Sequence, residues 1–194
     1  KRQGYMIPPG LSFIAMSQKA WEATERSNLP KFYLNLKSYR KSLLSNSNPY
    51  TPAVNLVFAL DESLKMMREE GLDNIFLRHD KHKLAMSNAV KALNLKLFAD
   101  ERYLSPAVTA IQTGEIDAEE FRKTIKNKFD ILLAGGQDHL KGKIFRVGHL
   151  GYVNNRDIIT VISAISRTLL DQGKITTKQA GEALEVASTY LEAN

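Results

Sequence analysis

The succession of hydrophobic periods along the chain is the feature that most limits its fold. Between residues 51 and 191, two helical segments are followed by two alternating segments, one helix, two more alternating segments and two helices. This order predicts an α/β chain of α+β character, with a small, mostly antiparallel sheet and helices on one face. The helices are expected at residues 18–26, 33–44, 52–70, 74–93, 118–129, 155–172 and 177–191, and the strands at residues 11–16, 95–98, 107–111, 131–134 and 144–149.

Capping and breaking residues mark the ends of several of these helices. Thr51 is the expected N-cap of residues 52–70, with Pro52 in the first turn, where a missing N–H costs nothing. Gly71 is expected to end that helix, and Asp117 and Asn154 are expected to cap later ones. The inward stripe of residues 52–70 is expected to consist of Val54, Val57, Phe58, Ser63, Leu64 and Met67.

The first residues do not fit a self-contained domain. Residues 11–16 are an apolar strand by composition, directly after the turn at residues 8–10, and Ser17 is the expected N-cap of the following helix. No partner strand is evident nearby, and an unpaired strand leaves backbone groups and apolar surface exposed. We therefore expect residues 4–27 to belong to a larger neighbour, and the chain to be the C-terminal part of a longer protein.

Composition excludes several classes of function. The 194 residues include no cysteine, so disulfides, thiolate zinc sites, iron–sulfur clusters and a cysteine nucleophile are excluded within them. The net charge of +6 comes from basic residues interspersed with acidic ones, which does not favour a nucleic-acid partner. The apolar runs at residues 53–60 and 158–165 are too short for a bilayer, so no membrane partner is expected. A cytoplasmic location is compatible with the lack of cysteine.

One arginine lies within an apolar strand. Arg146 is part of residues 143–151, KIFRVGHLG, between glycines that allow a ligand to approach the backbone. A planar guanidinium in such a place is suited to binding a carboxylate with two hydrogen bonds. The alternative is an arginine on an edge strand whose head lies in water.

Other patterns allow a structural and a functional reading. The turn at residues 48–52 could bind an anion at a helix start or could be a plain N-cap. The stiff segment at residues 4–10 could wrap a ligand or be a structural loop. The pair His79 and His82 shares a helix face, but a lone pair among basic residues rarely holds a metal, so no metal site is expected. His149 is expected to be a structural histidine.

Three segments resemble one family. Residues 4–11 (GYMIPPGL), 48–55 (NPYTPAVN) and 143–151 are similar, in order and spacing, to segments of the class V, fold-type-I pyridoxal-phosphate aminotransferases. The similarity is to their alanine–glyoxylate and serine–glyoxylate branch, close to the group named soluble hydrogenase small (tritium-exchange) subunits. It covers residues 4–173.

The resemblance implies roles for particular residues. Arg146 falls at the position of the family's substrate-carboxylate arginine. Thr51 falls where the family contributes a hydroxyl to the cofactor phosphate across a dimer interface, and Asn48 where some relatives carry a tyrosine with a similar contact. Gly135 and Gly136 match a glycine pair beside the substrate entrance.

The chain departs from the family at the Schiff-base lysine. The family reads Ser-Gln-Lys-Gly before the aromatic residue, whereas this chain reads Lys1-Arg2-Gln3-Gly4-Tyr5, so Gln3 occupies the lysine position. An amide can neither form the Schiff base nor carry the α-proton. The family's partner for the pyridine nitrogen and its stacking aromatic residue would lie upstream of residue 1. We therefore expect no catalytic residue in this chain, and no activity from it alone.

Together these observations give a set of expectations. Residues 1–27 are the end of a large cofactor-binding domain, residues 28–55 a connecting segment with the cofactor-phosphate turn, and residues 56–194 the small C-terminal domain. The full-length protein is a cytoplasmic, homodimeric aminotransferase that passes an amino group from alanine or serine through pyridoxal 5'-phosphate to a 2-oxo acid such as glyoxylate. The alternative is a non-catalytic interaction subunit of a redox complex.

Overall fold

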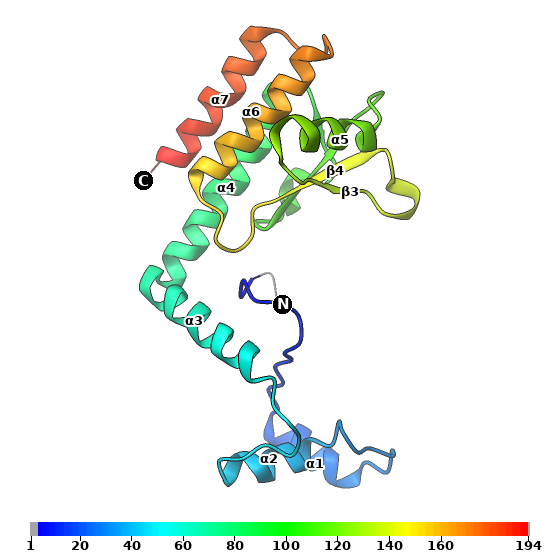
Figure 1. The fold of residues 1–194 in the computed structure, drawn as a ribbon, viewed down its shortest axis with the longest axis vertical. Coiled ribbons are helices and arrows are strands. Elements are labelled where there is room, and N and C mark those ends of the chain that lie inside the picture. Colours follow the sequence, from blue (N-terminus) through cyan, green and yellow to red (C-terminus); the bar gives the residue numbers. More distant parts are fainter. Residues whose placement is uncertain (1–3, 194) are drawn as a thin grey trace. The chain divides into compact units, whose positions relative to one another are not determined.

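The computed structural model describes residues 4–193 and divides the chain into two compact units, Lys1–Lys65 and Met66–Asn194. The helix α3 passes from the first unit into the second (Figure 1). The helices are α1 (Gln18–Arg26), α2 (Leu36–Leu44), α3 (Val54–Glu70), α4 (Leu72–Ala92), α5 (Ala118–Phe129), α6 (Asn155–Asp171) and α7 (Thr177–Glu192). The strands are β1 (Lys96–Leu97), β2 (Val108–Gln112), β3 (Ala134–Gly135) and β4 (Ile144–Gly148), with short 3-10 turns at Glu101–Tyr103 and Asp138–Leu140.

The second unit is built on one antiparallel sheet. Its strands lie in the order β1-β2-β4-β3, and β4 is central, since it pairs with β2 on one side and β3 on the other. Side chains alternate between the two faces of a strand, so Phe145 and Val147 of β4 face one way and Arg146 the other. Phe145 and Val147 belong to the buried core, together with Ile111 of β2. The predicted architecture, a small antiparallel sheet with helices on one face, is confirmed.

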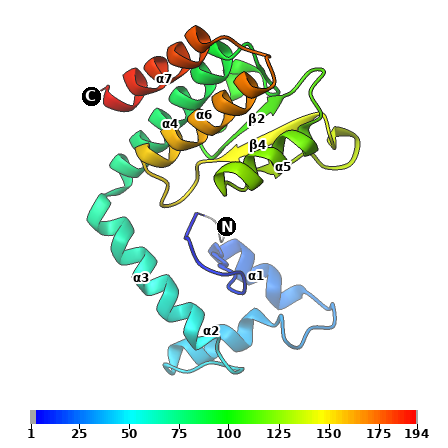
Figure 2. The same cartoon turned by 45° about the horizontal axis from the view of Figure 1, so that its top comes forward.

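The helices of this unit form a layer over the face that carries Phe145. Figure 2 shows α4, α6 and α7 packed together, with α5 lying along β4. Alanines recur at a helical spacing on α7, and their small side chains let α4 and α7 approach closely. The ring of Phe121 from α5 packs against Phe145, with the ring centroids 5.3 Å apart. The sheet and its helices therefore share one apolar core.

Local signals in the sequence account for many of the helix ends. The Asp117 side chain accepts from two backbone N–H groups at the start of α5, and Asn154 forms a capping box with Asp157 at the start of α6. Each such cap stabilises a helix by about 1 kcal/mol, because it satisfies backbone donors that have no partner inside the helix. Ser17 caps α1 as predicted, and α3 ends directly before Gly71, which has a φ of 82°.

No strand forms at the predicted residues 11–16 among the described residues. The segment has no regular secondary structure and pairs with no strand among the described residues, and Phe13 and Ile14 are mostly exposed. Alternation and apolar content favour a strand, yet a strand exists only where a neighbour supplies hydrogen bonds. The predicted strand at residues 131–134 is displaced toward Ala134–Gly135 for the same reason, because only these residues oppose β4.

The start and the inward face of α3 also differ from the prediction. Thr51 is not the N-cap, since α3 begins at Val54, whose N–H donates to the Pro52 carbonyl at 3.0 Å. That tight turn leaves Thr51 outside the helix. Of the predicted stripe, Ser63 is buried, whereas Phe58 is 70% exposed and Val54, Val57 and Leu64 are exposed. Among residues 4–65 only Ser63 is buried, so the described part of the first unit has no apolar core for this face.

Two other helices begin at points that differ from the prediction. The helix expected from residue 33 starts at Leu36, because the Asn35 side chain accepts from Lys37 N–H and fixes the start. The helix expected from residue 74 starts at Leu72, directly after Gly71. Within residues 4–193, no helix is both long and apolar enough to cross a membrane.

Candidate functional site

Arg146 occupies the centre of the sheet face that the helices leave open. It lies opposite Ala110 of β2 on one side and Ala134 of β3 on the other. The short alanine side chains leave the long arginine without a bulky neighbour across either strand. Arg146 is half-buried and is the only charged residue of β2, β3 and β4. These three strands thus carry a single cation, and the sheet's other charged residue, Lys96, lies on β1 at its edge.

A backbone hydrogen bond fixes the direction of the Arg146 side chain. Its Nε donates to the carbonyl oxygen of Gly135 at 2.9 Å. Within residues 4–193, neither Nη group of Arg146 takes part in a hydrogen bond or an ion pair. A half-buried guanidinium is more stable beside an anion, and its two remaining N–H edges match the two oxygens of a carboxylate. The alternative of an arginine on an edge strand does not fit, because β4 pairs with a strand on both sides, and the carboxylate clamp stays a prediction.

Gly135 of β3 and Gly136, which directly follows it, contribute in a way that the sequence did not predict. Gly135 supplies the carbonyl that holds Arg146. A Cβ at Gly135 would lie 2.5 Å from Arg122 Nη1, and one at Gly136 would lie 2.1 Å from the Leu140 carbonyl oxygen. Glycine at both positions lets β3 lie close to α5 and to the following turn. Their predicted place beside a substrate entrance stays a prediction.

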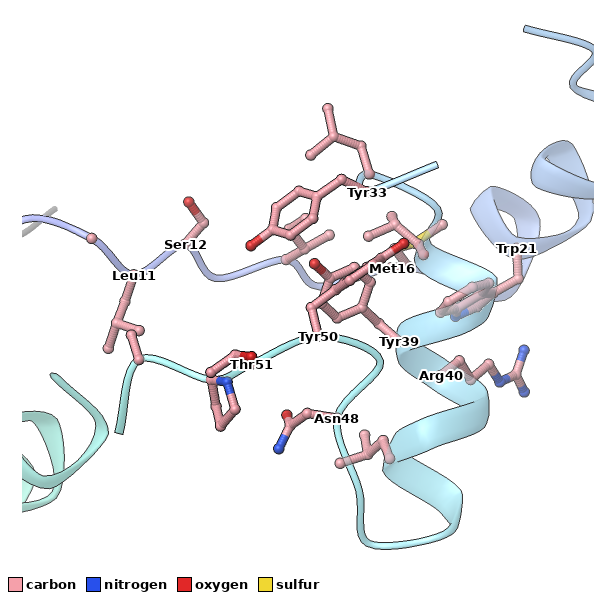
Figure 3. A pocket seen from close by; sticks show the side chains of 17 residues that line it. Leu11, Ser12, Met16, Trp21, Tyr33, Tyr39, Arg40, Asn48, Tyr50 and Thr51 are labelled. Carbon is pink, nitrogen blue, oxygen red and sulfur yellow. The ribbon is translucent and has the colours of Figure 1, made fainter. Parts of the chain in front are cut away.

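Thr51 and Asn48 lie together in the first unit, on the loop that follows α2 (Figure 3). Both are exposed and line a cavity of about 620 Å³. Because Thr51 does not cap α3, its hydroxyl has no hydrogen bond within the described residues and is available to a ligand. Hydroxyl and amide groups are common donors to phosphate oxygens.

Three tyrosines, Tyr33, Tyr39 and Tyr50, line one part of this cavity. Tyr33 and Tyr39 surround Tyr50, with ring centroids 4.7 Å and 5.9 Å from that of Tyr50 (Figure 3). The Tyr50 hydroxyl donates to the Phe32 carbonyl at 3.0 Å, which holds the loop beside α2. Desolvation raises the pKa of Tyr39, and the hydrogen bond with Tyr33 adds to the rise. Tyr39 is therefore neutral at physiological pH and acts as a hydrogen-bonding group.

A basic side chain stacks at the same cavity. The Arg40 guanidinium lies over the Trp21 ring, 4.7 Å from its centroid, so α1 and α2 are joined by a cation–π contact (Figure 3). Sequence reasoning missed this pair, because the two residues are nineteen positions apart and neither lies in a recognised motif.

Three histidines are buried in the second unit: His79 and His82, where no metal site was expected, and His149, expected to be structural. His79 Nδ1 donates to the Ile75 carbonyl at 2.7 Å, and its Nε2 accepts from Gly151 N–H at 3.3 Å. His82 Nε2 donates to Asn155 Oδ1 at 3.1 Å. No group of three potential metal ligands exists among residues 4–193. These histidines connect α4 to the segment between β4 and α6.

His149 is the third of these histidines and the most tightly held. Its Nδ1 donates to the Pro106 carbonyl at 3.0 Å, and its Nε2 accepts from the Thr109 hydroxyl at 2.9 Å. Burial lowers the pKa of His149 from 6.5 to about 4, and the neighbouring His82 and His79 add to the effect. The ring is therefore neutral at physiological pH, with its proton on Nδ1. The expectation of a structural histidine agrees with this placement.

An arginine clamps the same segment from α4. Arg78 Nη1 donates to the carbonyls of Gly151 and Val153, both at 2.9 Å. Its Nε and Nη2 donate to the Glu70 carboxylate at 2.6 Å and 2.9 Å, and this bond lowers the pKa of Glu70. Sequence reasoning missed the clamp, since more than seventy residues separate Arg78 from the backbone that it holds.

The predicted site residues thus fall into two groups. Thr51 and Asn48 share the cavity of the first unit, and Arg146 lies in the second unit. Gln3, at the position of the predicted Schiff-base lysine, lies outside the described residues.

Comparison with known proteins places this geometry in context. No family model matches the chain. It is 53% identical over 172 residues to a soluble hydrogenase 42 kDa subunit of Anabaena cylindrica, covering 89% of this chain and 45% of that protein. It is 34% identical to the serine–glyoxylate aminotransferase of Methylorubrum extorquens, over 100% of this chain and 49% of that protein. Among solved structures, ureidoglycine–glyoxylate aminotransferase from Bacillus subtilis matches with a TM-score of 0.87 and 28% identity, over 98% of this chain and 50% of that one. The chain spans about half the length of the curated relatives that it matches.

Proposed function

Because the chain belongs to the class V aminotransferases, we propose that the full-length protein transfers an amino group between an amino acid and a 2-oxo acid. The amino donor proposed is alanine or serine and the acceptor is a 2-oxo acid such as glyoxylate. The relatives named as serine–glyoxylate and ureidoglycine–glyoxylate aminotransferases support a glyoxylate-type reaction. Arg146 is the single observation that carries the proposal.

Arg146 would bind the carboxylate that amino acids and 2-oxo acids have in common. The Nε bond to Gly135 holds the guanidinium plane, so both Nη groups are directed by the strand rather than by solvent. A fixed carboxylate fixes the substrate's α-carbon, which is how orientation lowers the barrier of a proton transfer. The same arginine serves the donor and the acceptor in turn.

The residues of the first unit fit one end of the cofactor. Pyridoxal 5'-phosphate, when bound, supplies the electron sink for charge that develops at the α-carbon. The free hydroxyl of Thr51 and the amide of Asn48 suit its phosphate, and both line the same cavity. Residues 4–193 contain no assigned partner for the pyridine nitrogen, so this chain would hold only the phosphate end.

The proposal includes the organisation of the whole protein. Residues 1–27 would end the large cofactor-binding domain, residues 28–55 would bring Thr51 to the cofactor of a second subunit in a homodimer, and residues 56–194 would form the small domain. The chain alone would be inactive, because it would hold only the phosphate end of the cofactor. We propose a cytoplasmic location for the full-length enzyme.

The alternative of an interaction subunit in a redox complex depends on the name of a relative. That name describes the Anabaena protein. The present chain offers no cysteine to hold nickel, iron or a cluster, whereas Arg146 has a direct use in amino-group transfer.

Transamination by the purified full-length protein tests the proposal. With pyridoxal 5'-phosphate, alanine and glyoxylate, we expect glycine and pyruvate to form in equal amounts, and serine to give glycine and hydroxypyruvate. Protein stripped of the cofactor is the control and should regain activity when the cofactor is returned. Absence of amino transfer from every donor tested, by a folded and cofactor-saturated protein, would contradict the proposal.

Substitution of Thr51 tests the assignment of the phosphate end. We expect Thr51→Val to raise the cofactor concentration for half-saturation about tenfold, since a hydrogen bond to a charged group contributes about 1.5–3 kcal/mol. Thr51→Ser keeps the hydroxyl and should stay within about twofold to threefold of the wild type. Equal cofactor affinity in the two variants, measured by equilibrium dialysis, would show that the hydroxyl does not contact the cofactor.

A further inference from the structure

The Thr109–His149 hydrogen bond joins the two strands that define the position of Arg146. His149 directly follows β4, and Thr109 is the second residue of β2. Three hydrogen bonds tie His149 to the start of β2. Its backbone N–H donates to the Ala107 carbonyl at 3.0 Å, and its ring contacts the Pro106 carbonyl and the Thr109 hydroxyl. The end of β4 is thus held by side-chain bonds as well as by the backbone ladder.

The hydrogen bonds of His149 help to fix the pairing register of β2 and β4. The direction of the Arg146 side chain depends on this register. Thr109 pairs with Val147, and Ala110 pairs with Arg146. A slip of one residue would turn the Arg146 side chain toward the helix-covered face, because side chains alternate along a strand. It would also remove Arg146 from the carbonyl of Gly135. A bond that fixes the end of β4 therefore fixes the direction of the guanidinium.

The bond acts from the side of the sheet opposite to Arg146. Thr109 and His149 are buried, 5% and 0% exposed, on the covered face, whereas Arg146 faces the other way beside Ala110. Neither residue can contact a ligand held by the Arg146 guanidinium. Any effect of Thr109 on substrate binding must therefore pass through β4.

The surrounding groups keep the bond in one arrangement. The Pro106 carbonyl accepts the Nδ1 proton, so Nε2 is left to accept from the Thr109 hydroxyl. His79 and His82 of α4 help to lower the pKa of His149. Arg78, also on α4, donates a hydrogen bond to the carbonyl of Gly151, just beyond His149. A neutral imidazole can act as donor and acceptor at once, so it can link the two strands without burying a charge.

We propose that Thr109 and His149 are positioning residues for Arg146, fixing through the register of β4 the orientation in which it binds the substrate carboxylate. The proposal rests on the proposed aminotransferase function. It adds two residues, on the opposite face of the sheet, to those on which carboxylate recognition depends.

Two matched variants of the full-length enzyme test this proposal. Thr109→Val removes the hydroxyl and keeps the shape of the side chain, whereas Thr109→Ser keeps the hydroxyl. We expect Thr109→Val to raise KM for amino acid and 2-oxo acid about threefold to tenfold, and Thr109→Ser to stay close to the wild type. Hydrogen exchange at residues 144–148 should be faster in Thr109→Val than in Thr109→Ser. Equal KM values in the two folded variants would overturn the proposal.

A double-mutant cycle with Arg146 separates positioning from a general loss of stability. Where Arg146 is already lysine, Thr109→Val should add little, because the geometry that the bond maintains has been removed. If the effects of the two substitutions on KM multiply in the double variant, the positioning role is contradicted, whereas the proposed aminotransferase function still stands. If Arg146→Lys alone changes nothing, the carboxylate role fails and the positioning role falls with it. Should Thr109→Val not fold, His149→Gln supplies the same cycle, with the same expected non-additivity.

Discussion

Arg146→Lys in the full-length enzyme is expected to lower kcat/KM toward amino acids by at least about tenfold while the protein stays folded. Lysine keeps the charge but has neither the planar fork nor an Nε to donate to Gly135. A tenfold loss corresponds to about 1.4 kcal/mol of transition-state stabilisation. Because donor and acceptor share the carboxylate, kcat/KM for the 2-oxo acid should fall by a similar factor.

A second arginine provides the control for this substitution. Arg102 is exposed and pairs with the nearby Asp100, with Nη2 2.7 Å from Oδ2. Arg102→Lys also replaces a guanidinium by an ammonium in the second unit, and exposed ion pairs contribute little to stability. It should leave kcat/KM within about twofold. Unchanged kinetics for Arg146→Lys, with both substrates, would show that Arg146 has only a structural role.

The parts of the fold that were predicted correctly depend on short-range interactions. Asp117 and Asn154 cap α5 and α6 through backbone groups two or three residues away, so the signal is complete within one turn. Gly71 ends α3 because its positive φ is easily adopted by glycine. Such local rules do not depend on the rest of the protein.

The errors lie where a segment needs a neighbour from elsewhere. The apolar pattern at residues 11–16 is typical of a strand, but a strand requires a partner, and none lies among the described residues. The stripe on α3 that includes Phe58 fits a helix face, yet most of its apolar side chains are exposed. Periodicity identifies which face is apolar and does not say what covers it.

In the candidate site, too, local features could be predicted from the sequence and long-range contacts could not. The local pattern of an arginine in an apolar strand between glycines is enough to predict Arg146 as a candidate site residue. The Gly135 carbonyl that orients Arg146 is eleven residues away, and the Thr109 hydroxyl is forty residues from His149. Such contacts depend on the pairing of β2, β3 and β4, which a single sequence does not encode as a spacing.

Because His82 and His149 are buried, we expect the second unit to be less stable at acidic pH. In the folded protein, burial lowers the pKa of His149 to about 4 and also lowers the pKa of His82. Between pH 6.5 and 4 the unfolded chain therefore binds protons that the folded chain does not, and stability rises with pH in that range. The contribution of the buried, neutral histidines to the stability of the folded state is fully present above pH 6.5 and is lost as the pH falls toward 4. The ion-paired Glu70 acts in the same direction but at lower pH, because its pKa lies below 4.5.

We expect the free energy of opening of α4 and β4 to fall by about 2 kcal/mol between pH 7.5 and 5 from His149 alone, and by about 3 kcal/mol by pH 4. Hydrogen exchange of residues 72–92 and 144–148 at several urea concentrations, corrected for the intrinsic pH dependence of exchange, measures this change. In His149→Gln the protein should be less stable at pH 7.5, but the slope of stability against pH should be smaller by about one proton. The resonance of the His149 ring should not titrate between pH 7.5 and 5.5. A His149 ring that titrates near pH 6.5, or a slope unchanged by His149→Gln, would show that this histidine is not held neutral by burial.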